Sequence, residues 1–122
     1  SADMEILESM MAMLSGMWVF CLLIGIFGIV VMWKVFEKAN KPGWASLIPI
    51  YNTVVLFQIA GMNPWLILTM IIPIVNIVVI FMVYINMAKN FGKGTGFGIG
   101  LAILNIIFMA ILAFGDAEYQ GE

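Results

Sequence analysis

Long apolar runs constrain the fold of this chain more than any other feature of its sequence. Short polar segments separate four stretches dominated by aliphatic and aromatic side chains, at residues 10–33, 44–60, 65–87 and 97–114. A helix needs roughly 20 apolar residues to cross the ~30 Å hydrocarbon core of a bilayer. With 64% hydrophobic and 10% charged residues, the chain has too little polar surface to enclose a water-soluble core. We expect one all-α membrane domain, residues 1–122, with four transmembrane helices.

The first run is the clearest membrane helix. It is uninterrupted and ends at Trp33 and Lys34, an aromatic and a cation that suit the headgroup layer. Acids instead of lysines precede it, so we interpret it as a retained helix and not as a cleaved secretion signal. Trp44 and Trp65 begin the next two runs, and all three tryptophans are expected to be interface anchors.

Charge placement decides whether the short second run, residues 44–60, crosses the bilayer. All five cations are lysines in two loops: Lys34, Lys38, Lys41, Lys89 and Lys93. Lysine collects in cytoplasmic loops near helix ends. If the second run crosses, both lysine loops are cytoplasmic and both acidic termini, including Asp3, Asp116 and Glu122, lie outside. If it is a re-entrant or interfacial segment, the two lysine loops fall on opposite sides, so four spans with both termini outside fit best.

Spans two and three share the frame Ile-Pro-Ile-x-Asn-x-Val-Val-x-Phe. Residues 48–57 recur at residues 72–81 with seven of ten positions identical. In consecutive spans that run in opposite directions, such a sequence similarity suggests an inverted repeat of the kind found in transporters. Apolar helices are also built from few residue types and can match by chance, so a true repeat and a chance match both stay open as explanations.

The prolines and asparagines of this frame are the main polar features at membrane depth. A proline inside a helix removes a backbone hydrogen bond, so Pro49 and Pro73 are predicted to kink their spans. Asn52 and Asn76 follow three residues later, and Asn105 lies in the fourth run. Amide side chains in lipid either bond between neighbouring helices or line a wet cavity.

The glycine-rich segment does not predict a nucleotide site. Glycines alternate with other residues between positions 92 and 100, a spacing that fits neither phosphate-binding loops nor dinucleotide fingerprints. We expect a flexible turn there. Gly96 and Gly100, one turn apart, are predicted to form a close-packing helix face.

No enzyme, cofactor or metal site is expected. The chain has no histidine, and its carboxylates lie in termini or loops, whereas acid–base catalysis needs positioned titratable groups. Met10, Met13, Met17 and Cys21 share one helix stripe that could suit Cu(I). Because eleven methionines are spread through the chain, packing explains the stripe better. No basic surface for nucleic acid is present.

Several motifs carry a family resemblance: Lys41-Pro42-Gly43-Trp44, Leu47–Asn52, Ala88–Gly98 and Phe114–Tyr119. In these the chain resembles an uncharacterised family of small bacterial inner-membrane proteins, some of which are related to, or joined to, signal peptidase I. The resemblance implies a multi-pass protein of the bacterial cytoplasmic membrane. It implies no catalytic residues, because the Ser-Lys dyad region of a signal peptidase is lacking and any such activity would belong to a partner.

We therefore expect a non-enzymatic membrane subunit. Its partners would be the lipid bilayer and either copies of itself or the subunits of a larger inner-membrane complex. The alternative is a small oligomeric channel or carrier lined by Asn52, Asn76 and Asn105. The two hypotheses differ in whether these asparagines face a hydrated lumen or dry helix contacts.

Overall fold

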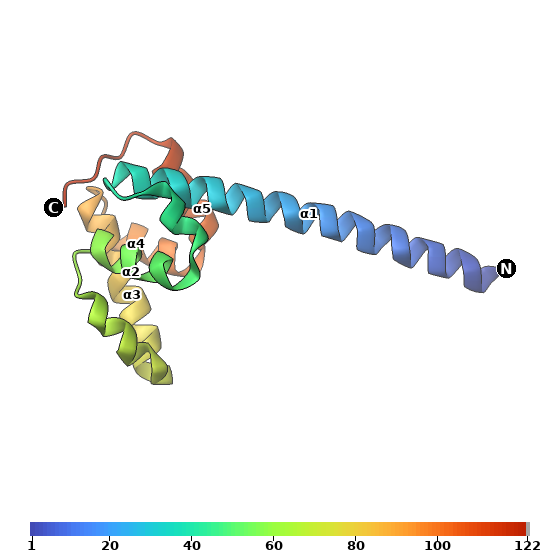
Figure 1. Cartoon of the computed structure of the whole chain (residues 1–122), viewed down its shortest axis with the longest axis horizontal. Coiled ribbons are helices and arrows are strands. Elements are labelled where there is room, and N and C mark those ends of the chain that lie inside the picture. Colours follow the sequence, from blue (N-terminus) through green and yellow to red (C-terminus); the bar gives the residue numbers. More distant parts are fainter. Residues whose placement is uncertain (122) are drawn as a thin grey trace.

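The computed structural model is all-helical and has two unequal parts (Figure 1). It describes residues 1–121; Glu122, one of the predicted outside acids, lies beyond them. One part is the long helix α1 (Ala2–Lys38). The other is a bundle at the C-terminal end of α1, made of the 3₁₀ helices η1 (Gly43–Leu47) and η2 (Pro64–Ile71) and of α2 (Pro49–Ile59), α3 (Pro73–Asn90), α4 (Thr95–Ile103) and α5 (Asn105–Phe114).

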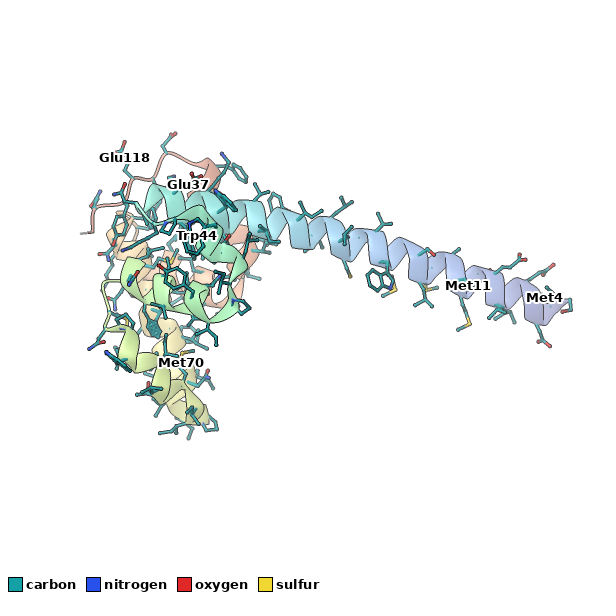
Figure 2. All side chains as sticks on the ribbon, viewed as in Figure 1. Met4, Met11, Glu37, Trp44, Met70 and Glu118 are labelled. Atoms are coloured by element: carbon teal, nitrogen blue, oxygen red, sulfur yellow. The ribbon has the colours of Figure 1, made fainter. Side chains whose placement is uncertain are left out.

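Most of α1 contacts nothing else in the chain. The helix begins at Ser1, whose hydroxyl accepts a hydrogen bond from the Met4 N–H at 3.4 Å, a typical N-cap arrangement. Its buried residues are Val31, Val35 and Phe36, all near the C-terminal end. The side chains of residues 2–26 are exposed on all sides of the helix (Figure 2). A helix that is apolar all round and unpacked in its own chain needs lipid or a partner as its surroundings.

Within the described residues, the rest of the chain forms three consecutive V-shaped helical hairpins. They are η1–α2, η2–α3 and α4–α5, and the two arms of each hairpin contact each other. A single non-helical residue separates the arms: Ile48, Ile72 or Leu104. Ile48 and Ile72 have extended backbone, at φ −104° and φ −85°, because a following proline disfavours the helical conformation.

The prediction that Pro49 and Pro73 kink continuous spans is wrong. Each proline is instead at the start of a helix, α2 or α3. A proline in the first turn costs no helical hydrogen bond, because the N–H groups there have no acceptor within the helix. The two prolines therefore mark breaks at which the chain reverses.

Four continuous spans are not confirmed. Among residues 1–121, α1 and α3 are long and apolar enough to cross a membrane, and α2 with η2 adds a third candidate only as a span bent by 119°. Residues 44–60 are divided between η1 and α2, and residues 97–114 between α4 and α5. With 11, 9 and 10 residues, α2, α4 and α5 measure about 14–17 Å at ~1.5 Å per residue, roughly half of the hydrocarbon core.

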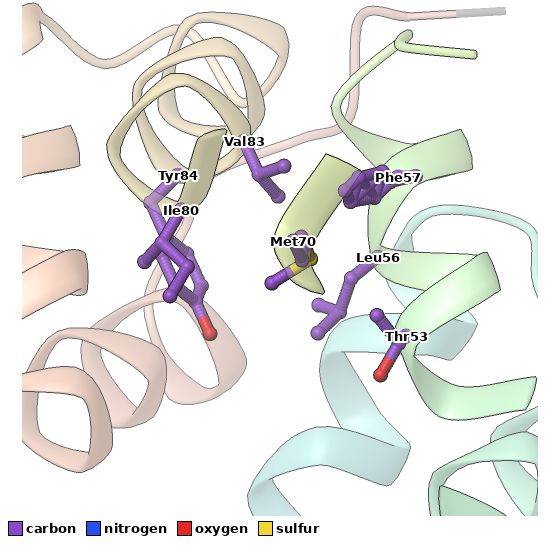
Figure 3. Close-up of a pocket in the computed structure, with 7 residues that line it drawn as sticks. All are labelled: Thr53, Leu56, Phe57, Met70, Ile80, Val83 and Tyr84. Atoms are coloured by element: carbon purple, nitrogen blue, oxygen red, sulfur yellow. The ribbon is translucent and has the colours of Figure 1, made fainter. Parts of the chain in front are cut away.

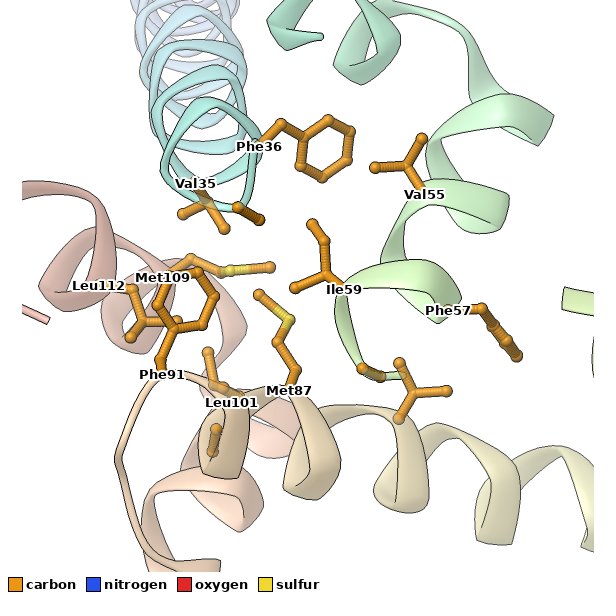
Figure 4. Packing of buried hydrophobic residues seen from close by; sticks show 14 of the residues in the cluster. Val35, Phe36, Val55, Phe57, Ile59, Met87, Phe91, Leu101, Met109 and Leu112 are labelled. Carbon is orange, nitrogen blue, oxygen red and sulfur yellow. The ribbon is translucent and has the colours of Figure 1, made fainter. Parts of the chain in front are cut away.

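The core lies where the hairpins meet the last third of α1 (Figure 4). Val35 and Phe36 of α1 face Ile59 of α2 and Met87 of α3 across it. α4 and α5 complete this cluster with Leu101, Met109 and Leu112, all fully buried. The bundle is thus held together by apolar packing around the base of α1.

The C-terminal ends of α1, α2, α3 and α5 gather at one end of the molecule, away from the N-terminus of α1 (Figure 1). Lys38 Nζ, at the end of α1, donates to the carbonyls of Leu112 at 2.5 Å and Gly115 at 3.1 Å, at the end of α5. Asn90 Nδ2, at the end of α3, donates to the Ile59 carbonyl at 2.9 Å, at the end of α2. Each hairpin therefore returns to the end from which it started.

This arrangement does not match the predicted placement of the C-terminus. The four-span topology put Asp116 and Glu118 opposite the lysine loops, but the tail that carries them begins beside Lys38. The four-span topology likewise placed the turn after Ile59 on the opposite side from Asn90. In the structure the Asn90 side chain donates a hydrogen bond to the Ile59 carbonyl. The reason is that the second and fourth apolar runs each turn back within their own length instead of continuing across.

Candidate functional site

The shared Ile-Pro-Ile-x-Asn frame forms the same turn twice. Asn52 Nδ2 donates to the Ser46 carbonyl at 3.2 Å, and Asn76 Nδ2 donates to the Met70 carbonyl at 2.7 Å. Each acceptor lies six residues before its asparagine, in the 3₁₀ helix on the other side of the proline. The amide thus donates to a carbonyl that the end of a helix leaves without an N–H donor. Asn52 and Asn76 close turns within their own hairpins.

The backbone of the two turns agrees as well. The Ile48 N–H donates to the Ala45 carbonyl at 3.2 Å, and the equivalent Ile72 N–H donates to the Thr69 carbonyl at 3.2 Å. The repeated sequence frame therefore corresponds to a repeated structural unit. Because α2 and α3 both end on the same side of the molecule, the two units run in the same direction, and the inverted arrangement suggested by the sequence is not what the fold contains.

Asn105 makes a different set of contacts. It is the first residue of α5, directly after the break at Leu104, and its Nδ2 donates to the Leu101 carbonyl at 3.1 Å. Its side chain is also hydrogen-bonded to Tyr84 of α3. The Asn105 side chain thus bonds to a helix outside its own hairpin, whereas the bonds of Asn52 and Asn76 described above lie within their hairpins.

Glycine packing is centred on a different pair from the predicted one. A Cβ atom at Gly98 would overlap the backbone of Ile85 on α3, and one at Gly100 would overlap the ring of Phe108 on α5. Gly96 faces open space. Gly100 is therefore close-packed against its own hairpin, whereas Gly98, which the Gly-x-x-x-Gly spacing passed over, is a position where the backbones of α3 and α4 lie close together.

The predicted interface tryptophans have distinct surroundings. The Trp33 ring covers Gly43, where a Cβ atom would overlap it, so the Pro-Gly-Trp loop packs back onto α1. Trp44 lies with its ring centroid 5.6 Å from that of Tyr51. Trp65, at the start of η2, is 76% exposed. Their role as membrane-interface anchors stays a prediction.

The lysines gather where the helix C-terminal ends meet. Lys34 Nζ lies 5.4 Å from the ring centroid of Phe114, and Lys93 Nζ lies 5.6 Å from that of Phe97, within cation–π range. Lys38 donates to the last carbonyls of α5, and Lys41 and Lys89 follow or end helices at the same end. Cations at this end complement the negative ends of the helix dipoles.

The C-terminal tail, residues 115–121, contributes contacts that the sequence analysis missed. The Tyr119 hydroxyl donates to the Ile59 carbonyl at 3.1 Å, and its ring centroid lies 5.4 Å from that of Phe91. The Gln120 N–H donates to the Asn90 carbonyl at 2.6 Å. The tail therefore ties the ends of α2 and α3 together. The one available signal was an aromatic residue in an otherwise polar tail.

A cavity of about 210 Å³ lies between the first two hairpins (Figure 3). Its lining consists of Thr53, Leu56, Phe57, Met70, Ile80, Val83 and Tyr84. Two hydroxyls are the only polar side-chain groups among these residues, so the cavity offers no carboxylate, amine or imidazole for acid–base chemistry. Over residues 1–121, no group of three or more His, Cys, Asp or Glu side chains is placed to hold a metal ion.

Comparison with known proteins places the chain in a family without an assigned activity. No curated protein matches it, and no solved structure matches it. One family model does match, over residues 44–122, which is well over half of the chain. The matched region contains α2 to α5 and all but the first residue of η1. The chain therefore belongs to the Family of unknown function (DUF5684).

Proposed function

We propose that this protein is a non-enzymatic integral membrane subunit that packs with copies of itself or with a larger bacterial inner-membrane complex. The observation that carries the proposal is the unoccupied surface of α1. A helix long enough to cross the bilayer leaves nearly all of its length free of intrachain contacts. Acting through other membrane proteins is the role that this surface fits best.

One face of α1 is shaped for a neighbouring helix. Trp18, Cys21, Leu22, Gly25, Ile26 and Ile29 line a shallow apolar groove. Gly25 and Gly28 have open space where a side chain would be. Small residues let membrane helices approach each other closely. Phe27, on the opposite face, stacks on Phe114 at 6.2 Å between centroids, so the groove is turned away from the bundle.

The remaining features agree with a packing role. Asn52 and Asn76 form hydrogen bonds within their own hairpins, which supports packing over a channel lined by asparagines. A four-span arrangement with both termini outside would require the hairpins to open into straight helices. The bacterial inner membrane and a partner related to signal peptidase I are the setting that the family resemblance suggests.

Cys21 provides a direct test, because it is the only cysteine and it lines the groove. Oxidation in native membranes should produce a disulfide-linked dimer if two grooves face each other. Gly25→Leu should fill the groove and reduce the cross-link. As a control, Leu23→Cys in a Cys21→Ala background places the thiol on the opposite side of the helix, where no cross-link is expected.

Affinity purification in mild detergent separates the two kinds of partner. A stoichiometric foreign membrane protein that is lost in the Gly25→Leu variant would support membership of a larger complex. A homo-oligomer lost in the same variant would support self-association. A monomer with no partner and no Cys21 cross-link would contradict the proposed function.

A further inference from the structure

The cavity between the first two hairpins lies among elements that are apolar enough for a membrane. Its lining comes from α2, η2 and α3. α3 is a candidate span by itself, and α2 with η2 is a candidate bent span. The same three elements carry highly exposed aliphatic side chains: Ile71 is 82% exposed, Ile50 79% and Ile74 78%. Because exposed apolar surface of this kind marks contact with lipid or protein, lipid acyl chains are the surroundings expected here.

The lining of the cavity runs from the interior of the bundle to its surface. Phe57 is 1% exposed and Val83 is 5% exposed, so both belong to the core. Leu56, Met70 and Ile80 are half-buried and reach the surface. Figure 3 shows Ile80 on one side of the space and Leu56 on the other, with Met70 between them. A chain-shaped ligand can therefore enter from the membrane and end against the core.

The two hydroxyls of the lining are already hydrogen-bonded. Thr53 Oγ1 donates to the Pro49 carbonyl at 3.3 Å, and the Tyr84 hydroxyl is hydrogen-bonded to the Asn105 side chain. A buried water needs about two to four polar partners, whereas apolar cavities of about 150 Å³ stay dry and take up apolar molecules. At about 210 Å³, this cavity is suited to an apolar ligand.

The size and charge of the cavity distinguish between apolar occupants. A neighbouring helix measures about 10–12 Å across, which is too wide for a space of about 210 Å³. No lysine is among the lining residues, so no cation there would pair with the carboxylate of a free fatty acid. One acyl chain of a phospholipid meets both limits, because it is narrow and its headgroup stays at the membrane surface.

We propose that this cavity binds one acyl chain of a bilayer phospholipid. The chain lies between Leu56 of α2 and Ile80 of α3 and ends against Phe57 and Val83. It thereby fills the space between the first two hairpins and acts as part of their apolar packing. The proposal needs a membrane setting but not the subunit role.

Retention of lipid after detergent exchange tests this proposal. The full chain would be reconstituted with equal amounts of a phosphatidylethanolamine and a free fatty acid, each carrying a photoactivatable diazirine in the middle of the acyl chain. After exchange into lipid-free detergent and irradiation, mass spectrometry should find one phosphatidylethanolamine adduct per chain, on residues 53–57 or 80–84. Retention of the fatty acid alone, adducts confined to the exposed part of α1, or no retained lipid would overturn the proposal.

Substitutions that fill the cavity provide the matched comparison. Ile80→Phe places a larger side chain in the cavity and should abolish retention. Val78→Phe, on nearly the opposite face of α3 at ~3.6 residues per turn and at a position 52% exposed, should not. Leu56→Phe fills the cavity from α2 and should cause the same loss, so the result does not depend on the folding of one variant. Equal retention in all three variants, or equal loss, would overturn the proposal. These positions lie outside α1, so this result is distinguishable from failure of the Cys21 test.

Discussion

Gly96 and Gly98 look alike in the sequence but have opposite surroundings. Gly98 touches the backbone of Ile85, whereas Gly96 faces open space. Gly98→Ala should therefore force α3 and α4 apart and lower the free energy of unfolding by about 1–3 kcal/mol, the usual cost of overpacking. Gly96→Ala should leave it unchanged or raise it by up to ~1 kcal/mol, because alanine favours helix. Unfolding by denaturing detergent measures both, and equal effects would contradict the packing.

Residue chemistry alone predicted the importance of some positions but not their roles. That Asn52 and Asn76 would need partners followed from the cost of an unpaired amide in lipid. The sequence did not predict that each partner would be a carbonyl six residues back, because that contact depends on the chain reversing at Ile48 and Ile72. A proline at the start of a helix and one in its interior look the same in an apolar run. The position of Pro49 and Pro73 therefore had to come from the structure.

At the scale of elements, the C-terminal tail acts as a strap across two helix ends. Tyr119→Phe removes the hydrogen bond to Ile59 but keeps the ring beside Phe91, so it should cost about 0.5–1.5 kcal/mol. Tyr119→Ala removes both contacts and should cost more. Hydrogen exchange should report faster opening at the turn of residues 60–63 and the loop of residues 91–94. If exchange changed only in the tail itself, the strap would have no structural role.

Hydropathy predicted the elements more reliably than their paths. All four apolar runs are helical over most of their length, because every backbone group in lipid needs an internal partner. Apolar content cannot distinguish a helix that crosses from a pair that turns back, since both contact lipid along their length. The lysine pattern favoured crossing because both lysine loops then lie on one side. Hairpins that return to their starting end satisfy the same condition, which is why charge placement did not separate the two topologies.

On the scale of the whole molecule, α1 is divided into an outer part without intrachain packing and an inner part that belongs to the core. Phe20 and Phe36 represent the two parts: Phe20 is 64% exposed and Phe36 is 0% exposed. The family match begins after α1, at residue 44. The matched hairpins therefore need the inner part of α1 to complete one side of their hydrophobic core. The outer part serves contacts outside the fold.

A matched pair of substitutions checks this division. Phe36→Ala should remove a side chain packed between α1 and the hairpins, at a cost of about 3–5 kcal/mol on the scale measured for buried aromatics. Phe20→Ala should leave unfolding of the bundle unchanged, because Phe20 touches no core residue and exchanges one lipid-facing surface for a smaller one. Unfolding followed by the near-ultraviolet signal of the bundle compares the two. Equal losses would mean that the outer part of α1 folds back onto the hairpins.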